Sequence, residues 1–164
     1  MRCAVALGSN LGDRLAHLQA GFAAVGALNE GPAAPLISAI YETEPVDCDP
    51  GTAAYLNAVI EIESSLEPLA LLAALQTIEH AQGRPADHGY HAPRTLDLDL
   101  LYAGERVLQS AALTLPHPRI AQRRFVLRPL SDLHPGLILP GTRKTVAELL
   151  TGVPHHPLVE PFVS

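Results

Sequence analysis

The sequence predicts an α+β protein whose core is a ferredoxin-like antiparallel sheet with helices packed on one face. Segments with a period of two, typical of strands, and segments with a period near 3.6, typical of helices, follow one another in the order β-α-β-β-α-β. The 164 residues are 48% hydrophobic, enough for one buried core. We therefore expect a single domain over residues 1–164, extended at its C-terminal end by short strands and helices.

The first quarter of the chain predicts a strand, a helix and a second strand. Residues 1–8 are mostly apolar and predict the first strand. Residues 8–13 form a turn with capping residues, and apolar side chains then recur at helical spacing over residues 15–25. Residues 36–42 predict the second strand.

A loop, a third strand and a second helix come next. Residues 44–54 contain two prolines and a glycine and predict a loop. Residues 56–64 are apolar at every second position, which predicts a strand with one face in the core. Pro68 is favoured at the first position of a helix, and Gly83 is favoured just after its end.

The fourth strand is predicted over residues 93–102, where polar and apolar residues alternate. Asp97 and Asp99 should share one face, while Leu98 and Tyr102 should face the core. Beyond Gly104 the patterns are shorter, and the segments that they predict are strands near residues 106–110 and 113–115 and helices near residues 123–133 and 146–150.

The two aspartates of this strand predict a metal site. Carboxylates two residues apart on a strand lie about 7 Å apart, and two-metal phosphate sites hold cations about 4 Å apart. Arg94 adds a planar donor suited to phosphate oxygens. Two aspartates can also form only the solvated side of a sheet, but Asp is disfavoured in strands and neighbouring like charges repel. A site for a polyphosphate is the stronger interpretation.

Charge and composition limit the classes of molecule that the protein is expected to bind. The net charge of −6 disfavours nucleic acid and acidic membranes, whereas ten of the eleven basic residues are arginines that suit a small phosphorylated ligand. No apolar run is long enough to span a membrane, and the apolar part of the N-terminus is too short for a signal peptide. Cys3 and Cys48 show neither disulfide-like nor metal-like spacing, so a reducing cytoplasm is expected.

Four ordered blocks resemble a known family. They are residues 6–13 (ALGSNLGD), residues 41–43 (YET) with 55–59 (YLNAV), residues 93–99 (PRTLDLD), and residues 115–119 (LPHPR) followed by Arg123 and 125–127 (FVL). Together they resemble the 6-hydroxymethyl-7,8-dihydropterin pyrophosphokinases of folate synthesis, over Cys3 to about Pro140. The resemblance implies a magnesium-dependent enzyme, with two Mg²⁺ ions expected, that transfers pyrophosphate from ATP to the pterin and releases AMP. It further implies small-molecule partners only and a monomer.

The resemblance also implies residue roles. The positions that match catalytic groups are Arg84, Arg94, Asp97 and Asp99, the two aspartates being the magnesium ligands. The positions that match pterin contacts are Thr43, Val46, Tyr55, Asn57 and Phe125. The positions that match nucleotide contacts are Gln76, Glu79, Arg84, Arg94, Thr114, His117 and Arg123. The chain departs from the family pattern at Ala86 and Ala112, where arginines are often found, and at His91, where a tryptophan is found.

Structural alternatives stand beside these roles. Gln76 and Glu79 could form a solvated helix face, Phe125 could be core packing, and His117 a structural turn residue. Glu61 is expected to be a solvated charge. Three other functions remain open at this stage: a non-catalytic pterin- or nucleotide-binding relative, a metal-dependent phosphohydrolase, and a protein-interaction module.

Overall fold

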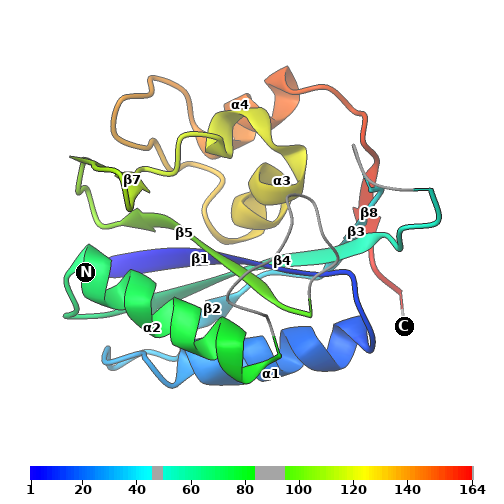
Figure 1. Cartoon of the computed structure of the whole chain (residues 1–164). Coiled ribbons are helices and arrows are strands. Elements are labelled where there is room, and N and C mark those ends of the chain that lie inside the picture. The colour runs from blue at the N-terminus through cyan, green and yellow to red at the C-terminus, as the bar shows by residue number, and fades with distance from the viewer. Residues whose placement is uncertain (46–49, 84–94, 164) are drawn as a thin grey trace.

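A six-stranded sheet forms the centre of the computed structural model, which describes residues 1–45, 50–83 and 95–163. All of its strand pairs are antiparallel (Figure 1). The main path runs in the order β5-β1-β4-β3-β8, and β2 pairs with β4 beside it. The strands are β1 (Arg2–Ser9), β2 (Leu36–Ile37), β3 (Tyr41–Thr43), β4 (Tyr55–Glu63), β5 (Asp97–Ala103) and β8 (Val159–Pro161). The α+β class with an antiparallel sheet is therefore confirmed.

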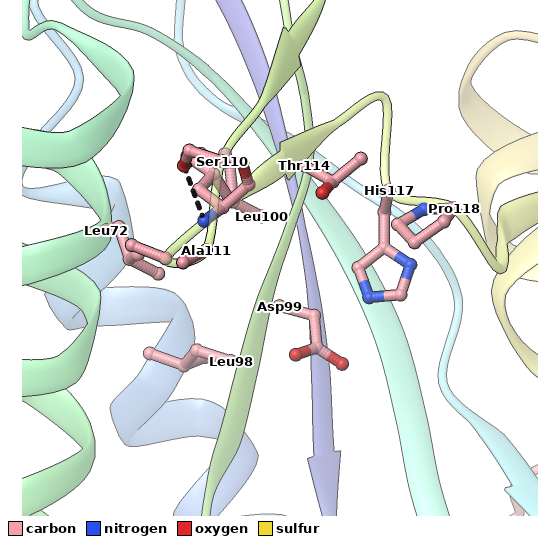
Figure 2. Close-up of a pocket in the computed structure, with 11 residues that line it drawn as sticks. Leu72, Leu98, Asp99, Leu100, Ser110, Ala111, Thr114, His117 and Pro118 are labelled. Atoms are coloured by element: carbon pink, nitrogen blue, oxygen red, sulfur yellow. Dashed lines mark hydrogen bonds between the residues drawn. The ribbon is translucent and has the colours of Figure 1, made fainter.

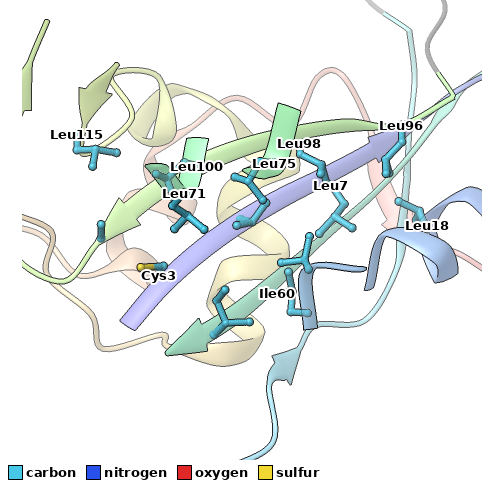
Figure 3. Close-up of a cluster of buried hydrophobic side chains, with 14 of the residues drawn as sticks. Cys3, Leu7, Leu18, Ile60, Leu71, Leu75, Leu96, Leu98, Leu100 and Leu115 are labelled. Atoms are coloured by element: carbon cyan, nitrogen blue, oxygen red, sulfur yellow. The ribbon is translucent and has the colours of Figure 1, made fainter. Parts of the chain in front are cut away.

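Helices cover both faces of this sheet (Figure 1). One face packs against α1 (Arg14–Gly26) and α2 (Pro68–Ala81), through a cluster that includes Leu7, Leu18, Leu75 and Leu98 (Figure 3). The opposite face packs against α3 (Arg124–Leu133) and α4 (Val146–Gly152), through a second cluster that includes Val59, Val126 and Leu127. The two helices of the β-α-β-β-α-β segment thus share a face, as predicted, and the C-terminal helices add a layer on the other face.

Three short elements complete the described fold. Strands β6 (Leu108–Gln109) and β7 (Thr114–Leu115) pair with each other in a separate two-stranded sheet, and a 3₁₀ turn (Ile120–Gln122) precedes α3. Within the described residues, none of the helices is both long and apolar enough to span a membrane.

Local signals explain the ends of the helices. The Asp13 side chain accepts a hydrogen bond from the Ala16 amide at 3.0 Å and caps α1. Pro68 occupies the first turn of α2, and Gly83 after its end adopts a φ of 90°, which suits glycine. These were the boundaries that the sequence predicted.

The single strand predicted over residues 36–42 was wrong, because it is divided into β2 and β3. Ile37 pairs with Ile60, whereas Tyr41 pairs with Asn57, so one extra residue interrupts the ladder. Ser38 lies at the interruption, where its hydroxyl accepts a hydrogen bond from the Val59 amide at 2.9 Å. The side chain thus replaces a backbone acceptor there.

The expected orientation of Tyr102 was also wrong. Val5 pairs with Leu100 but Ala4 pairs with Tyr102, so Leu101 is an extra residue in β5. A β-bulge of this kind reverses the alternation beyond it. Tyr102 therefore packs on the α3/α4 face of the sheet, and Leu98 and Leu100 pack on the α1/α2 face.

Candidate active site

The two predicted metal ligands lie on β5, at the edge of the sheet. Asp97 is opposite Gly8 of β1, and Asp99 is opposite Ala6. Both aspartates are half-buried and alternate with the buried Leu98. They therefore share one face of the sheet, as predicted from the sequence, and this is the face that α3 and α4 cover.

A cavity of about 270 Å³ lies beside Asp99 (Figure 2). Its walls come from α2, β5, the β6–β7 turn and the segment before the 3₁₀ turn, and include Leu72, Thr114 and His117. Figure 2 shows the Asp99 carboxylate and the His117 ring extending into the same space. Two predicted nucleotide contacts are thus brought together with a predicted metal ligand, although they are separated along the chain. Ala112 also lines the cavity.

His117 is held as a neutral hydrogen-bond donor. Its backbone amide donates to the Leu101 carbonyl at 2.8 Å, and its Nδ1 accepts from the Arg119 amide at 3.2 Å. Burial, followed by the positive charges of Arg123 and Arg119, lowers the pKa of His117 below the usual 6.5, against a raising effect of Asp97. With Nδ1 accepting, the proton of the neutral ring is assigned to Nε2, which can donate to an anionic oxygen.

The lowered pKa of His117 predicts a pH dependence of stability. The unfolded chain binds a proton at this group near pH 6.5, whereas the folded chain binds it only at lower pH. The contribution of His117 to the free energy of unfolding is therefore fully present above pH 6.5, and it is lost as the pH falls toward the lowered pKa. Urea unfolding at pH 7.5 and pH 5.5 should show a smaller loss of stability in His117→Gln than in the parent protein. An equal loss in both proteins would contradict this account of His117.

A second group of predicted residues lies on the same face of the sheet. Asn57 of β4 is only 7% exposed, and its Nδ2 donates to the Thr43 Oγ1 of β3 at 2.9 Å. Tyr55 lies two residues before Asn57 and is paired with Thr43. Phe125 is in the first turn of α3, which covers this face, and the Arg123 guanidinium lies 5.5 Å from the centre of its ring. The structure thus gathers four of the five predicted pterin contacts around the ends of β3 and β4 and the start of α3.

Two predicted nucleotide contacts on α2 differ in their surroundings. Glu79 is 7% exposed, and its Oε1 accepts a hydrogen bond from the Leu98 amide at 2.7 Å. This bond joins α2 to the strand between the two aspartates. Gln76, one turn earlier, is exposed. The alternative of a solvated helix face is therefore wrong for Glu79. Val46, Arg84 and Arg94 lie outside the described residues.

Comparison with known proteins identifies the family of this chain. Residues 4–135 match the family described as 7,8-dihydro-6-hydroxymethylpterin-pyrophosphokinase (HPPK). The chain belongs to the HPPK family. It is 41% identical to the 2-amino-4-hydroxy-6-hydroxymethyldihydropteridine pyrophosphokinase of Pseudomonas aeruginosa, over 93% of this chain and 92% of that relative. The enzyme of the same name from Bacillus subtilis is 40% identical over 79% of this chain and 75% of the relative.

Solved structures agree with the fold. A crystal structure of HPPK-DHPS in complex with substrates superposes on 92% of this chain with a TM-score of 0.69 and 12% identity. This chain spans 45% of that longer protein. At such low identity the likeness supports the fold alone.

The donor set in this HPPK chain fits magnesium. Mg²⁺ prefers hard oxygen ligands and is commonly held by one or two carboxylates, with the remaining positions filled by water and substrate phosphates. Asp99 supplies a carboxylate at the wall of a cavity large enough for phosphate groups, and Asp97 supplies a second carboxylate two residues earlier on the same strand. Among the residues that the structure describes, no group of three or more His, Cys, Asp or Glu side chains could hold a metal. Those residues therefore do not form a closed protein cage around a metal ion.

The sequence reading of this HPPK chain missed one buried polar network. Glu61 was expected to be a solvated charge, but it is 5% exposed. Its carboxylate accepts a hydrogen bond from the Tyr102 hydroxyl and pairs with His134 Nε2 at 2.9 Å. Burial and the bond to Glu61 raise the pKa of Tyr102 above its usual range. The signal was available, since Glu61 follows Asn57 and Val59 at every second position on the same face of β4.

A second contact fastens α3 to the sheet in this HPPK chain. The Tyr41 hydroxyl of β3 donates to Asp132 Oδ2 at 2.7 Å, and burial together with that contact raises the pKa of Tyr41 to about 12. The Arg128 guanidinium lies 5.0 Å from the centre of the Tyr41 ring. Because His134 and Asp132 belong to the C-terminal end of α3, both contacts set the position of the helix that begins beside Phe125.

Proposed function

We propose that this protein transfers the pyrophosphoryl group of ATP to the hydroxymethyl oxygen of 6-hydroxymethyl-7,8-dihydropterin, releasing AMP, as a step of folate biosynthesis. The observation that carries this proposal is the arrangement on the α3/α4 face. Asp99 lines a cavity together with Thr114 and His117, and Asp97 lies across Gly8 of β1 from Asn57, which contacts Thr43. Family membership supports the reaction, and this arrangement supports the proposal that the two substrates occupy separate regions.

The two aspartates would hold two magnesium ions. When bound, such ions would supply positive charge that neutralises the negative charge developing on the phosphates during phosphoryl transfer. The protein itself mainly positions the reactants and supplies fixed charges. Asp97 and Asp99 meet that need because β5 holds both carboxylates on one face.

The nucleotide would occupy the cavity beside β5. His117 Nε2 is suited to donate to a phosphate oxygen, and Thr114, which lines the same cavity, adds a hydroxyl. The Arg123 guanidinium, at the start of α3, adds a cation near His117, whose pKa it lowers. Arg84 and Arg94 are proposed as further phosphate contacts, and Gln76 and Glu79 as residues on the nucleotide side of α2.

The pterin would lie against β3, β4 and the start of α3. The carboxamide of Asn57, which contacts Thr43, can both donate to and accept from the aminopyrimidinone edge. Val46 is proposed as a further pterin contact. Tyr55 and Phe125 would stack on the two faces of the bicyclic ring. In the reaction, the hydroxymethyl oxygen attacks the β-phosphorus, the bond from the β-phosphorus to the oxygen of the α-phosphate breaks, and AMP leaves with that oxygen.

Replacing Phe125 by alanine should weaken binding of the pterin more than binding of ATP. Loss of one stacked ring removes on the order of 2 kcal/mol, which is roughly a thirtyfold rise in the Kd for the pterin. Phe125→Tyr keeps the ring and should keep the affinity. Fluorescence titration with 6-hydroxymethylpterin measures this binding, and calorimetry with ATP and Mg²⁺ measures the other. Equal losses for both ligands would instead mark Phe125 as a packing residue.

The reaction itself is tested by identifying the nucleotide product. Purified protein is mixed with ATP, Mg²⁺ and 6-hydroxymethyl-7,8-dihydropterin, and nucleotides are separated by ion-exchange chromatography. AMP that forms only when the pterin is present supports the proposal. ADP with free phosphate would indicate a phosphohydrolase, and the absence of any product would indicate a relative that binds without turnover.

We also propose a fold type and a domain organisation for this chain. The strand order β5-β1-β4-β3, with α1 and α2 on one face, supports assignment of the core as ferredoxin-like. Cores on both faces of one sheet support a single domain over residues 1–164. A monomer in the cytoplasm, acting only on small molecules, remains a prediction from the sequence.

A further inference from the structure

Gly8 lies between the two substrate regions. On β1 it is opposite Asn57 of β4 on one side and Asp97 of β5 on the other. Residues directly opposite in antiparallel strands project from the same face, so a side chain at position 8 would lie between the Asn57 and Asp97 side chains. With neighbouring strands 4.7–4.9 Å apart, the Asn57 and Asp97 backbones are separated by roughly 9.5 Å across Gly8.

The backbone does not require glycine at this position. Gly8 lies within a regular strand and has no positive φ, in contrast to Gly12, whose φ is 68°. An L-residue could therefore adopt the same backbone conformation. The neighbouring residues on the same face of β1, Ala6 and Ala4, both carry a methyl group that contacts the α3/α4 core. The absence of a side chain at Gly8 must be explained by the space above it.

That space adjoins the acceptor end of Asn57. A Cβ added at Gly8 would lie 3.3 Å from Asn57 Oδ1 and 3.7 Å from the Tyr55 ring. The Asn57 amide is oriented by its donation to Thr43 on the far side, so its oxygen is directed toward Gly8. A methyl group here would be in close contact with the Asn57 oxygen. It would also fill part of the space above the strand between the Asn57 and Asp97 side chains.

We propose that Gly8 determines specificity for a bicyclic substrate, because its missing side chain leaves the passage that the ring occupies between Asn57 and Asp97. This inference rests on the proposed function, in which Asn57 holds the aminopyrimidinone edge and Asp97 would hold a metal ion beside the reacting phosphates. The roughly 9.5 Å span is comparable with the long axis of a pterin that carries one hydroxymethyl arm. The pterin ring would thus lie directly over the backbone of Gly8. Gly8 does not line the cavity beside Asp99 in which the nucleotide is proposed to bind.

The test compares Gly8→Ala with a matched control, Gly152→Ala. A Cβ at Gly152, at the end of α4, meets nothing within 4 Å, so the control makes the same chemical change in open space. Binding of 6-hydroxymethylpterin is measured by fluorescence in the presence of Mg²⁺ and α,β-methylene ATP, in which the reacting bond cannot break. Gly8→Ala should raise the Kd for the pterin by about tenfold or more, the effect of one intrusive methyl group in a fitted pocket.

Two further readouts separate a specific effect from damage to the fold. The Kd for the nucleotide, measured without pterin, and the urea midpoint of unfolding should match those of Gly152→Ala. An unchanged pterin Kd in Gly8→Ala, beside tight binding by the parent protein, would overturn the inference and leave the proposed function intact. Parallel losses of pterin affinity, nucleotide affinity and stability would also overturn it, because Gly8 would then be a packing glycine. Failure of the parent protein to bind the pterin would overturn the proposed function and this inference with it.

Discussion

Alanine in place of Asp97 or Asp99 is expected to reduce pyrophosphoryl transfer by at least about 100-fold while the fold is retained. Each substitution removes a carboxylate that would hold a metal beside the phosphates, and loss of one group that stabilises developing charge costs about that factor or more. The fold should persist because both side chains are half-buried at the edge of the sheet and contribute no apolar packing. Initial rates of AMP formation at saturating substrates measure the effect.

Glu105→Ala is the matched control for the aspartates. It also removes one carboxylate, from the exposed turn that follows β5, and should leave the rate unchanged. The concentration of Mg²⁺ that gives half-maximal rate should rise in any Asp97 or Asp99 variant that retains measurable activity. Full activity in both aspartate variants, at the magnesium concentration that saturates the parent protein, would refute the assignment of these residues as metal ligands.

Glu61→Ala is expected to lower the free energy of unfolding by about 3 kcal/mol, the largest stability effect predicted for this chain. The substitution leaves the buried Tyr102 hydroxyl without its acceptor and removes the partner of His134. The buried Tyr102 hydroxyl would then be desolvated without compensation, and the partly buried His134 ring would lose its partner. Urea denaturation followed by circular dichroism at pH 7 measures the change.

Two companion variants show which interaction is responsible. Glu61→Gln keeps an oxygen that can accept from Tyr102 and should lose less stability than Glu61→Ala. Glu160→Ala, on the exposed part of β8, should change stability by no more than about 0.5 kcal/mol. If Glu61→Ala were no more destabilising than Glu160→Ala, the buried network would not stabilise the protein.

Much of the fold follows from local patterns. The start of α1 and both ends of α2 were predictable because Asp13, Pro68 and Gly83 act through their own backbone neighbours. The shared face of Asp97 and Asp99 was predictable because the strand geometry alone produces it. Resemblance to the family named the residues of both substrate regions, several of which the structure brings to one face of the sheet.

Other features depend on partners that are distant in the chain. Strand β8 was not predicted, because three residues that include Pro161 carry no recognisable periodicity and form a strand only by pairing with β3. The bulge at Leu101 arises from the register between β5 and β1, so the sequence of β5 alone placed Tyr102 on the wrong face. The burial of Glu61 required α3 to cover that part of β4 and bring His134 to it.

The sequence by itself determined the order of the elements, the helix ends, the face of the aspartate pair and the family. These properties depend on a residue's own conformation and on neighbours within a few positions, which the sequence displays directly. Only the tertiary structure decided which strands are neighbours, which faces are covered, and hence that Gly8 lies between Asn57 and Asp97 and that Glu61 is buried. These depend on cross-strand register and on packing between layers, where a shift of one residue moves a side chain to the opposite face.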